Sequence, residues 1–169
     1  MKNKPTVVFC ASVKHAEEIA ELFRRAGIEA MCISGGTKAA DRKQILADYE
    51  SGKLPVLCAC DLLNEGWDSP HTQVLFMARP TMSKTIYIQQ LGRGMRKSPG
   101  KDFLMVFDFV DNTNMFNVAC SIHRMHHSKH LGTLQFNKAL VRQLTDEDYA
   151  AIRESCHAAI ARYFGTAKA

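Results

Sequence analysis

The stretch TVVFCASVKHAEEIAELFRRAG, residues 6–27, places a run of β-branched and aromatic residues directly before an amphipathic segment. Residues 6–11 have the composition of a buried strand. In the segment that follows, apolar residues recur at helical spacing, charged residues occupy the other side, and Gly27 supplies the stop. The positions predicted to be buried on this helix are Ala16, Ile19, Ala20 and Phe23. A buried strand followed at once by a helix is the unit from which parallel α/β sheets are built.

The same unit recurs as far as about residue 110. Further strand-like runs are EAMCIS (29–34), LPVLCAC (54–60), QVLFMA (73–78) and DFLMVFDFV (102–110). A second helix is predicted over residues 39–50, with Ile45, Leu46 and Tyr49 facing inward and Gly52 at its end. The sequence therefore predicts an α/β fold in which helices cover both faces of a parallel sheet.

The pattern changes after residue 112. A histidine-rich segment, HRMHHSKH (123–130), precedes a further amphipathic helix that is predicted to begin at the N-cap Thr145 and to stop at Gly165. Its apolar stripe consists of Tyr149, Ile152, Cys156, Ile160 and Tyr163. We interpret residues 1–112 as the domain proper and residues 113–169 as a helical extension.

Composition gives only broad limits. The 169 residues are 46% hydrophobic and 23% charged, which is typical of one globular core, and the net charge of +5 slightly favours a polyanionic partner. No apolar run approaches the roughly 18 residues that a membrane span needs, so no membrane association is expected. Most of the six cysteines lie in apolar, strand-like runs. We therefore expect free thiols in a reducing compartment and a cytoplasmic protein.

The stretch QQLGRGMRK, residues 89–97, combines arginines with glycines on a predicted helix. At about 100° per residue, Gln89, Arg93 and Arg96 fall within about 60° of one another. The opposite side carries Tyr87, Ile88, Leu91 and Met95. Each glycine should cost about 1 kcal/mol relative to alanine, which close approach of a ligand or a neighbouring element would offset. A fraying helix end with solvated arginines is the alternative.

Polar residues also follow three of the predicted strands. Ser12 follows the first, SGGT (34–37) follows the second, and CDLLNEGWDSP (60–70) includes the end of the third. The carboxyl ends of parallel strands line the ligand crevice of such sheets, and backbone N–H groups at a helix N-terminus suit phosphate oxygens. Ordinary helix caps and tight turns remain alternative interpretations of each segment.

In this order, the segments resemble the motifs of the second RecA-like domain of superfamily 2 helicases and translocases. FCASVKHAEEIAELF resembles motif IV, ISGGT with ILADYESGKLPVL the motif IVa region, CDLLNEGWDSP motif V, and QQLGRGMR motif VI. EGWDSP, ARPTMSKTIYIQQLGRGMRKSPGK and DFVDN are most similar to DEAD/DEAH-type and type I/III restriction-like DNA translocases. The resemblance covers residues 5–112, and motifs at the right separations are more specific than any one alone.

The resemblance implies that Arg93 and Arg96 reach across an interdomain cleft to the γ-phosphate of ATP, with Gln89 organising that contact. Close packing at the cleft is then a reason for Gly92. Gly66 and Asp68 match positions beside the nucleotide ribose, and Asp61 matches an acid that couples motif V to motif VI. The positions implied to contact the nucleic-acid backbone are Ser12, Gly36, Thr37 and Cys60, and Cys60 replaces a threonine common among RNA helicases.

The implied ligands are ATP with Mg²⁺, held mainly by a first RecA-like domain, and DNA, with RNA as the alternative. The sequence contains neither a GxxxxGK[ST] loop nor a strand ending in paired Asp and Glu. We therefore expect this chain to supply half of the ATPase site of a longer or split helicase or translocase, and to be inactive alone.

The sequence also offers alternatives to this function. A non-catalytic module that binds nucleic acid or protein would keep the fold without needing an arginine pair on one helix face. Metal-ligand residues gather at Cys120, His123, His126, His127 and His130. Because structural zinc sites usually combine two separated ligand pairs, we predict no metal there and interpret these residues as a polar helix face. A redox function is disfavoured because CAC (58–60) lacks CxxC spacing.

Overall fold

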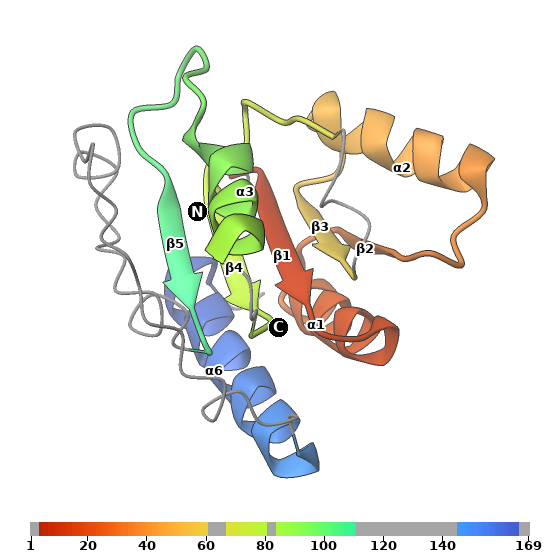
Figure 1. Cartoon of the computed structure of the whole chain (residues 1–169), viewed down its shortest axis with the longest axis vertical. Coiled ribbons are helices and arrows are strands. Elements are labelled where there is room, and N and C mark those ends of the chain that lie inside the picture. The colour runs from red at the N-terminus through yellow and green to blue at the C-terminus, as the bar shows by residue number, and fades with distance from the viewer. Residues whose placement is uncertain (1–3, 61–66, 81–83, 111–144, 166–169) are drawn as a thin grey trace.

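The computed structural model describes residues 4–60, 67–80, 84–110 and 145–165. They form a sheet of five parallel strands in the order β2-β3-β1-β4-β5 (Figure 1). The strands are β1 (Thr6–Cys10), β2 (Ala30–Ile33), β3 (Val56–Ala59), β4 (Val74–Ala78) and β5 (Met105–Asp108). Each lies inside one of the predicted runs, so the predicted parallel α/β fold is confirmed.

The central strand sets the register of the sheet. Val8 of β1 lies opposite Cys58 of β3 on one side and Phe76 of β4 on the other. Because every pair is parallel, the carboxyl ends of all the strands meet at one edge. Side chains alternate along β1, so Val8 joins one apolar core while Val7 joins the other.

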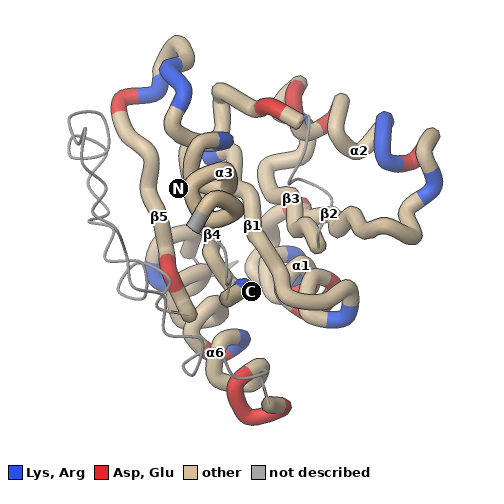
Figure 2. Tube along the Cα trace, in the orientation of Figure 1, with Lys and Arg blue, Asp and Glu red and all other residues tan. Residues whose placement is uncertain are grey.

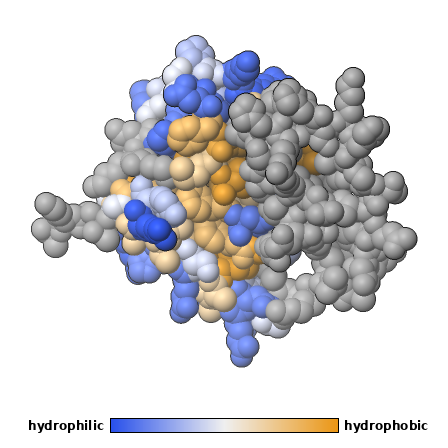
Figure 3. Space-filling view, turned by 90° about the vertical axis from the view of Figure 1, so that its left-hand side faces the viewer, coloured by the Kyte–Doolittle hydropathy of each residue, from blue (hydrophilic) through white to orange (hydrophobic). Residues whose placement is uncertain are grey.

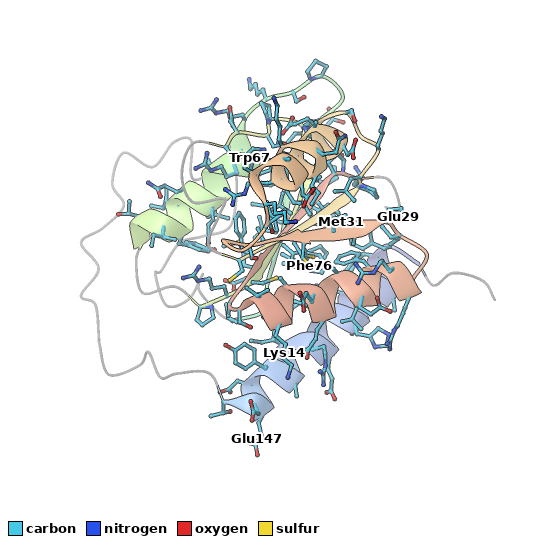
Figure 4. The ribbon with its side chains drawn as sticks, turned by 90° about the vertical axis from the view of Figure 1, so that its right-hand side faces the viewer. Lys14, Glu29, Met31, Trp67, Phe76 and Glu147 are labelled. Carbon is cyan, nitrogen blue, oxygen red and sulfur yellow. The ribbon has the colours of Figure 1, made fainter. Side chains whose placement is uncertain are left out.

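Helices cover both faces of the sheet. The helices α1 (Val13–Arg25) and α6 (Asp146–Tyr163) lie on one face, and α2 (Ala39–Glu50) and α3 (Lys84–Met95) lie on the other. Figure 4 shows these layers from the side, with Phe76 toward α1 and α6 and Trp67 on the side of α2 and α3. Burial on both faces explains why the strands are nearly continuous apolar runs.

The two helices α1 and α6 pack on each other and on the sheet. The predicted buried face of α1 is confirmed, and His15 joins it. Thr145 caps α6 as predicted, through a capping box with Asp148. Phe164, at the end of α6, lies 5.3 Å from the ring of Phe23. Aromatic contact at one end and the Arg153–Glu18 ion pair of 3.3 Å near the other fix α6 along α1.

The helix α2 matches its predicted bounds but is buried less than expected. Tyr49 is the one residue of α2 that is fully buried, while Ile45 and Leu46 are partly buried. Gly52 has φ of 79°, a left-handed conformation that suits glycine after a helix. The helix is therefore attached to the sheet chiefly through its C-terminal end.

The strand β5 is shorter than its predicted run. Its pairing with β4 begins where the Met105 N–H donates to the carbonyl of Gln73, at 2.9 Å. Before that point Phe103 is exposed, and Leu104 packs under α3 instead of joining the sheet. The strand forms an edge of the sheet with half-buried residues, and Figure 3 shows apolar side chains gathered on that side of the molecule.

Several expectations concern residues outside the described ranges. The histidine-rich segment and the first part of the extension lie there. Within the described ranges, no three potential metal ligands come together and no helix is long and apolar enough to cross a membrane. Cys10, Cys58 and Cys156 are free thiols inside the core, and burial raises the pKa of Cys10 and Cys156.

His15 makes the stability of the α1–α6 contact depend on pH. Its side chain is only 2% exposed, neither ring nitrogen has a hydrogen-bond partner among the described residues, and the Tyr149 ring lies edge-on at 5.2 Å. Burial lowers its pKa, with Glu18 opposing and Arg153 adding to the shift. Below about pH 6.5 the unfolded chain therefore binds a proton that the folded chain excludes, and stability falls.

We predict that His15→Phe removes this loss. Between pH 7.5 and pH 5, the free energy of unfolding in urea should fall more steeply in the wild type than in His15→Phe, by up to about 1.4 kcal/mol per pH unit. His157→Phe, at an exposed position of α6, is the matched control and should follow the wild type. Parallel curves for the wild type and His15→Phe would show that His15 does not titrate differently in the folded state.

Candidate functional site

The two predicted arginines meet one segment of the chain, residues 67–72, which we call the 67–72 segment. The Arg93 guanidinium donates a hydrogen bond to the carbonyl oxygen of Trp67, and the Arg96 guanidinium pairs with the carboxylate of Asp68. Because α3 ends at Met95, Arg96 lies just beyond the helix and not on it as expected. The structure therefore brings together Arg93, Arg96 and Asp68.

The buried side of α3 differs slightly from the predicted one. Tyr87 and Leu91 are buried as expected, and Gln89 is exposed on the other side. Gln90 is also buried, whereas Ile88 and Met95 are only half-buried. The buried stripe thus follows positions 87, 90, 91 and 94, and it is rotated from the prediction toward Gly94.

The structure separates the roles of the two glycines in α3. A Cβ atom on Gly94 would lie 2.5 Å from Cδ1 and 3.0 Å from Cδ2 of Leu104, so any other residue here would force the Leu104 side chain to shift. A Cβ atom on Gly92 would meet no described atom within 4 Å. Close packing of Gly92 at the interdomain cleft stays a prediction, whereas Gly94 packs closely within the described chain.

A buried polar network joins the 67–72 segment to α2. Thr72 donates to the Ser69 hydroxyl at 3.1 Å and accepts from the Tyr49 hydroxyl at 2.9 Å. His71 contacts Ser69 at 3.0 Å through Nδ1 and the Tyr49 carbonyl at 3.1 Å through Nε2. Burial raises the pKa of Tyr49 far above its usual value, so the phenol keeps its proton. The segment is therefore anchored to the C-terminal end of α2.

Lys101 is a third cation, and it lies between the end of α3 and the 67–72 segment. Sequence reasoning missed it. Its Nζ atom donates to the carbonyl oxygens of Pro70 at 2.9 Å and Arg96 at 3.0 Å, and also to that of Gly94. Burial lowers the pKa of Lys101 to about 8. Figure 2 shows basic residues gathered on the loop after α3, but basic side chains in a loop are usually solvated, so composition gave no signal.

The residues predicted to contact nucleic acid lie elsewhere. Ser12, Gly36 and Cys60 follow the carboxyl ends of β1, β2 and β3, which are neighbouring strands. The Ser12 hydroxyl accepts from the His15 N–H at 3.1 Å, and the Thr37 hydroxyl accepts from the Ser34 N–H at 2.9 Å. The Cys60 side chain is buried, and its N–H donates to Ile33 at 3.2 Å. These residues share one edge of the sheet.

Two clusters therefore occupy different places on the fold. Asp68 lies with Arg93 and Arg96 at the C-terminal ends of α2 and α3, and not at the carboxyl edge with Ser12, where it was expected. The predicted site residues Asp61 and Gly66 lie outside the described ranges, and their roles stay predictions. A cationic pair on one surface and a helix N-terminus on another could bind two different anionic ligands.

Comparison with known proteins decides the family. Residues 1–98, more than half of the chain, match the model of the helicase conserved C-terminal domain. The chain belongs to the helicase C-terminal domain family. The matched residues include β1 to β4 and α3. They therefore contain Arg93 and Arg96 but not Lys101.

Relatives of this helicase domain include two yeast proteins whose names describe ATP-dependent helicases. The protein irc3 of Schizosaccharomyces pombe, named as mitochondrial, is 38% identical over 107 residues, which are 63% of this chain and 18% of that protein. IRC3 of Saccharomyces cerevisiae is 32% identical over 107 residues, 63% of this chain and 16% of its own length. The chain thus spans less than a fifth of either relative.

Solved structures share the fold of this helicase domain. The Escherichia coli DEAD-box protein SrmB, solved with the regulator RraA, is 22% identical with a TM-score of 0.55, over 68% of this chain and 67% of that one. Dbp5 of Saccharomyces cerevisiae, solved with RNA and ADP BeF3, is 18% identical with a TM-score of 0.53, over 68% of this chain and 31% of that one. The predicted RecA-like fold is confirmed, and the restriction-like subtype stays a prediction.

We predict opposite effects of alanine at the two glycines of α3. Gly92→Ala should stabilise the domain by up to about 1 kcal/mol, because it improves helix propensity where there is space. Gly94→Ala should destabilise it by about 1–3 kcal/mol, because the new methyl group displaces buried Leu104. Urea unfolding of the 169-residue chain measures both. Equal effects of the two substitutions would contradict the packing described for Gly94.

Proposed function

We propose that this domain is the second motor domain of an ATP-dependent superfamily 2 helicase or translocase that acts on nucleic acid. In this function, Arg93 and Arg96 act on ATP held by a first RecA-like domain. The observation that carries the proposal is the convergence of both arginines with Asp68 at one surface of a helicase C-terminal domain. A module that only bound nucleic acid would not require this pair beside an acidic residue.

The chemistry of phosphoryl transfer suits these side chains. Charge spreads over the equatorial oxygens of the γ-phosphate in the transition state, and an always-charged planar guanidinium stabilises it. The Arg96 side chain is 66% exposed and its partner Asp68 is 35% exposed, so their ion pair is a weak surface interaction. We infer that Arg96 can leave Asp68 for a phosphate at little cost, whereas Arg93 is held by a backbone carbonyl.

The described residues fit part of a nucleotide and not its metal ion. Guanidinium groups suit phosphate oxygens, and the Asp68 carboxylate could accept hydrogen bonds from a ribose once Arg96 has moved. No group of three potential metal ligands occurs within the described ranges. We assign Mg²⁺, which neutralises phosphate charge in such reactions, to the first RecA-like domain together with most of the ATP contacts.

The nucleic-acid strand is assigned to the carboxyl edge of β1, β2 and β3. There Ser12 caps α1, whose N-terminus carries a partial positive charge, and Gly36 and Thr37 lie after β2, with Gly36 exposed and Thr37 half-buried. Cys60 can contribute through its position at this edge but not through an exposed thiol. We propose DNA as the substrate, with RNA as the alternative. Closure of the two motor domains would then tie hydrolysis to movement along the strand.

We predict that Arg96→Ala abolishes ATP hydrolysis but largely spares ATP binding. In the intact helicase that contains this domain, the kcat for nucleic-acid-stimulated hydrolysis should fall by roughly 10³-fold or more, as for other arginine fingers. The Kd of a fluorescent ATP analogue should change little, because most ATP contacts belong to the first domain. Steady-state phosphate release and equilibrium fluorescence titration provide the two measurements.

Arg25→Ala is the matched control, because Arg25 is an exposed arginine of α1 on the other face of the sheet. It should leave kcat unchanged. The 169-residue chain alone should show negligible turnover. Wild-type kcat in Arg96→Ala would remove the assignment of a catalytic arginine and favour a module that binds without hydrolysis.

A further inference from the structure

The side chain of Lys101 bridges two elements at the proposed catalytic surface. Its ammonium group contacts Pro70 in the 67–72 segment and, on the other side, the carbonyls of Gly94 and Arg96 at the end of α3. The loop is shaped for this contact, because the Lys101 N–H closes a turn to Ser98 at 3.1 Å and Gly100 has φ of 74°. Three backbone carbonyls therefore converge on one cation.

An ammonium group matches this arrangement closely. It has three donors and no acceptor, and here each of its three acceptors is a carbonyl oxygen. Carbonyls in the last turn of a helix lack intrahelical partners and carry a partial negative charge. Lys101 thus caps α3 and at the same time ties its end to Pro70.

Lys101 differs from Arg96 in the kind of partner that it binds. Arg96 pairs with a side chain and would exchange it for a phosphate in the proposed reaction, whereas Lys101 binds only backbone atoms in the described chain. Its contacts can therefore persist through the catalytic cycle. They fix the backbone of Arg96 itself, whose carbonyl oxygen is one of the three acceptors.

We propose that Lys101 is a positioning residue, which holds the end of α3 on the 67–72 segment so that Arg96 is presented to the γ-phosphate. This proposal rests on the function proposed above. The neutral amine has two N–H donors and a lone pair, so loss of the proton breaks one of the three contacts. The charged and titratable groups on the elements that Lys101 joins are Arg93, Arg96, Lys97 and Asp102 around the loop and Asp68 and His71 in the 67–72 segment.

The first test uses the 169-residue chain and needs no ATP. NMR signals of the Arg93 and Arg96 Nε–Hε groups should move with a midpoint near pH 8 in the wild type, because burial lowers the pKa of Lys101 to about 8. In Lys101→Met the signals should shift at neutral pH and lose this titration. Lys97→Met, at an exposed neighbouring position, should behave as the wild type.

Arginine signals that are identical in the wild type and Lys101→Met would overturn the proposal. If Lys101→Met does not fold, the wild-type titration decides alone. Arginine signals that stay constant while the Lys101 Cε signal titrates would show that the two groups are not coupled.

The second test uses the intact helicase. Lys101→Met should lower kcat roughly 10- to 100-fold, the range expected when a catalytic group is misplaced by about 1 Å, and should leave the KM for ATP nearly unchanged. The wild-type kcat should decline above pH 8, and this decline should be absent from Lys101→Met. Unchanged kcat in the variant would overturn the positioning role. Absence of ATPase in the wild type would instead refute the proposed function, and the NMR result would still decide the contacts of Lys101.

Discussion

Three cationic side chains hold the end of α3 against the 67–72 segment, and the geometry of the proposed site depends on this contact. Arg93 and Lys101 donate to backbone carbonyls, so their positions do not rely on the rotamer of any partner. Arg96 instead pairs with the Asp68 carboxylate at the surface, where an ion pair contributes little to stability. The surface thus combines two fixed cations with one that can change its partner.

Buried contacts beneath this surface attach it to the rest of the domain. The Tyr49 hydroxyl and its partners Thr72 and Ser69 hold the 67–72 segment on the C-terminal end of α2. Gly94 lets α3 approach Leu104, just before β5, more closely than another residue would allow without a shift of the Leu104 side chain. Tyr49 and Leu104 both belong to the core on this face of the sheet. Ser12 and Gly36 lie at the opposite, carboxyl edge of the same sheet. One sheet therefore carries both the surface proposed for ATP and the edge proposed for nucleic acid.

Sequence reasoning predicted the strands and helices well, because burial on both faces imposes apolar runs and because helical spacing is regular from Ala16 to Phe23. It also predicted that Arg93, Arg96 and Asp68 would serve one site. It did not predict that α3 ends at Met95. It could not predict that Gly94 is the packed glycine, because this depends on contact with Leu104. The contacts of Tyr49 and Lys101 join residues 23 and 31 positions apart, and no local pattern encodes them.

We propose that Arg96 exchanges the Asp68 carboxylate for the γ-phosphate of ATP bound to another domain. This exchange can be tested with a structure of the intact helicase bound to nucleic acid and ADP–beryllium fluoride. We predict that the Arg96 guanidinium lies within hydrogen-bond distance of the beryllium fluoride and has left Asp68, while Lys101 still contacts Pro70. A closed complex in which Arg96 remains paired with Asp68, away from the nucleotide, would contradict it.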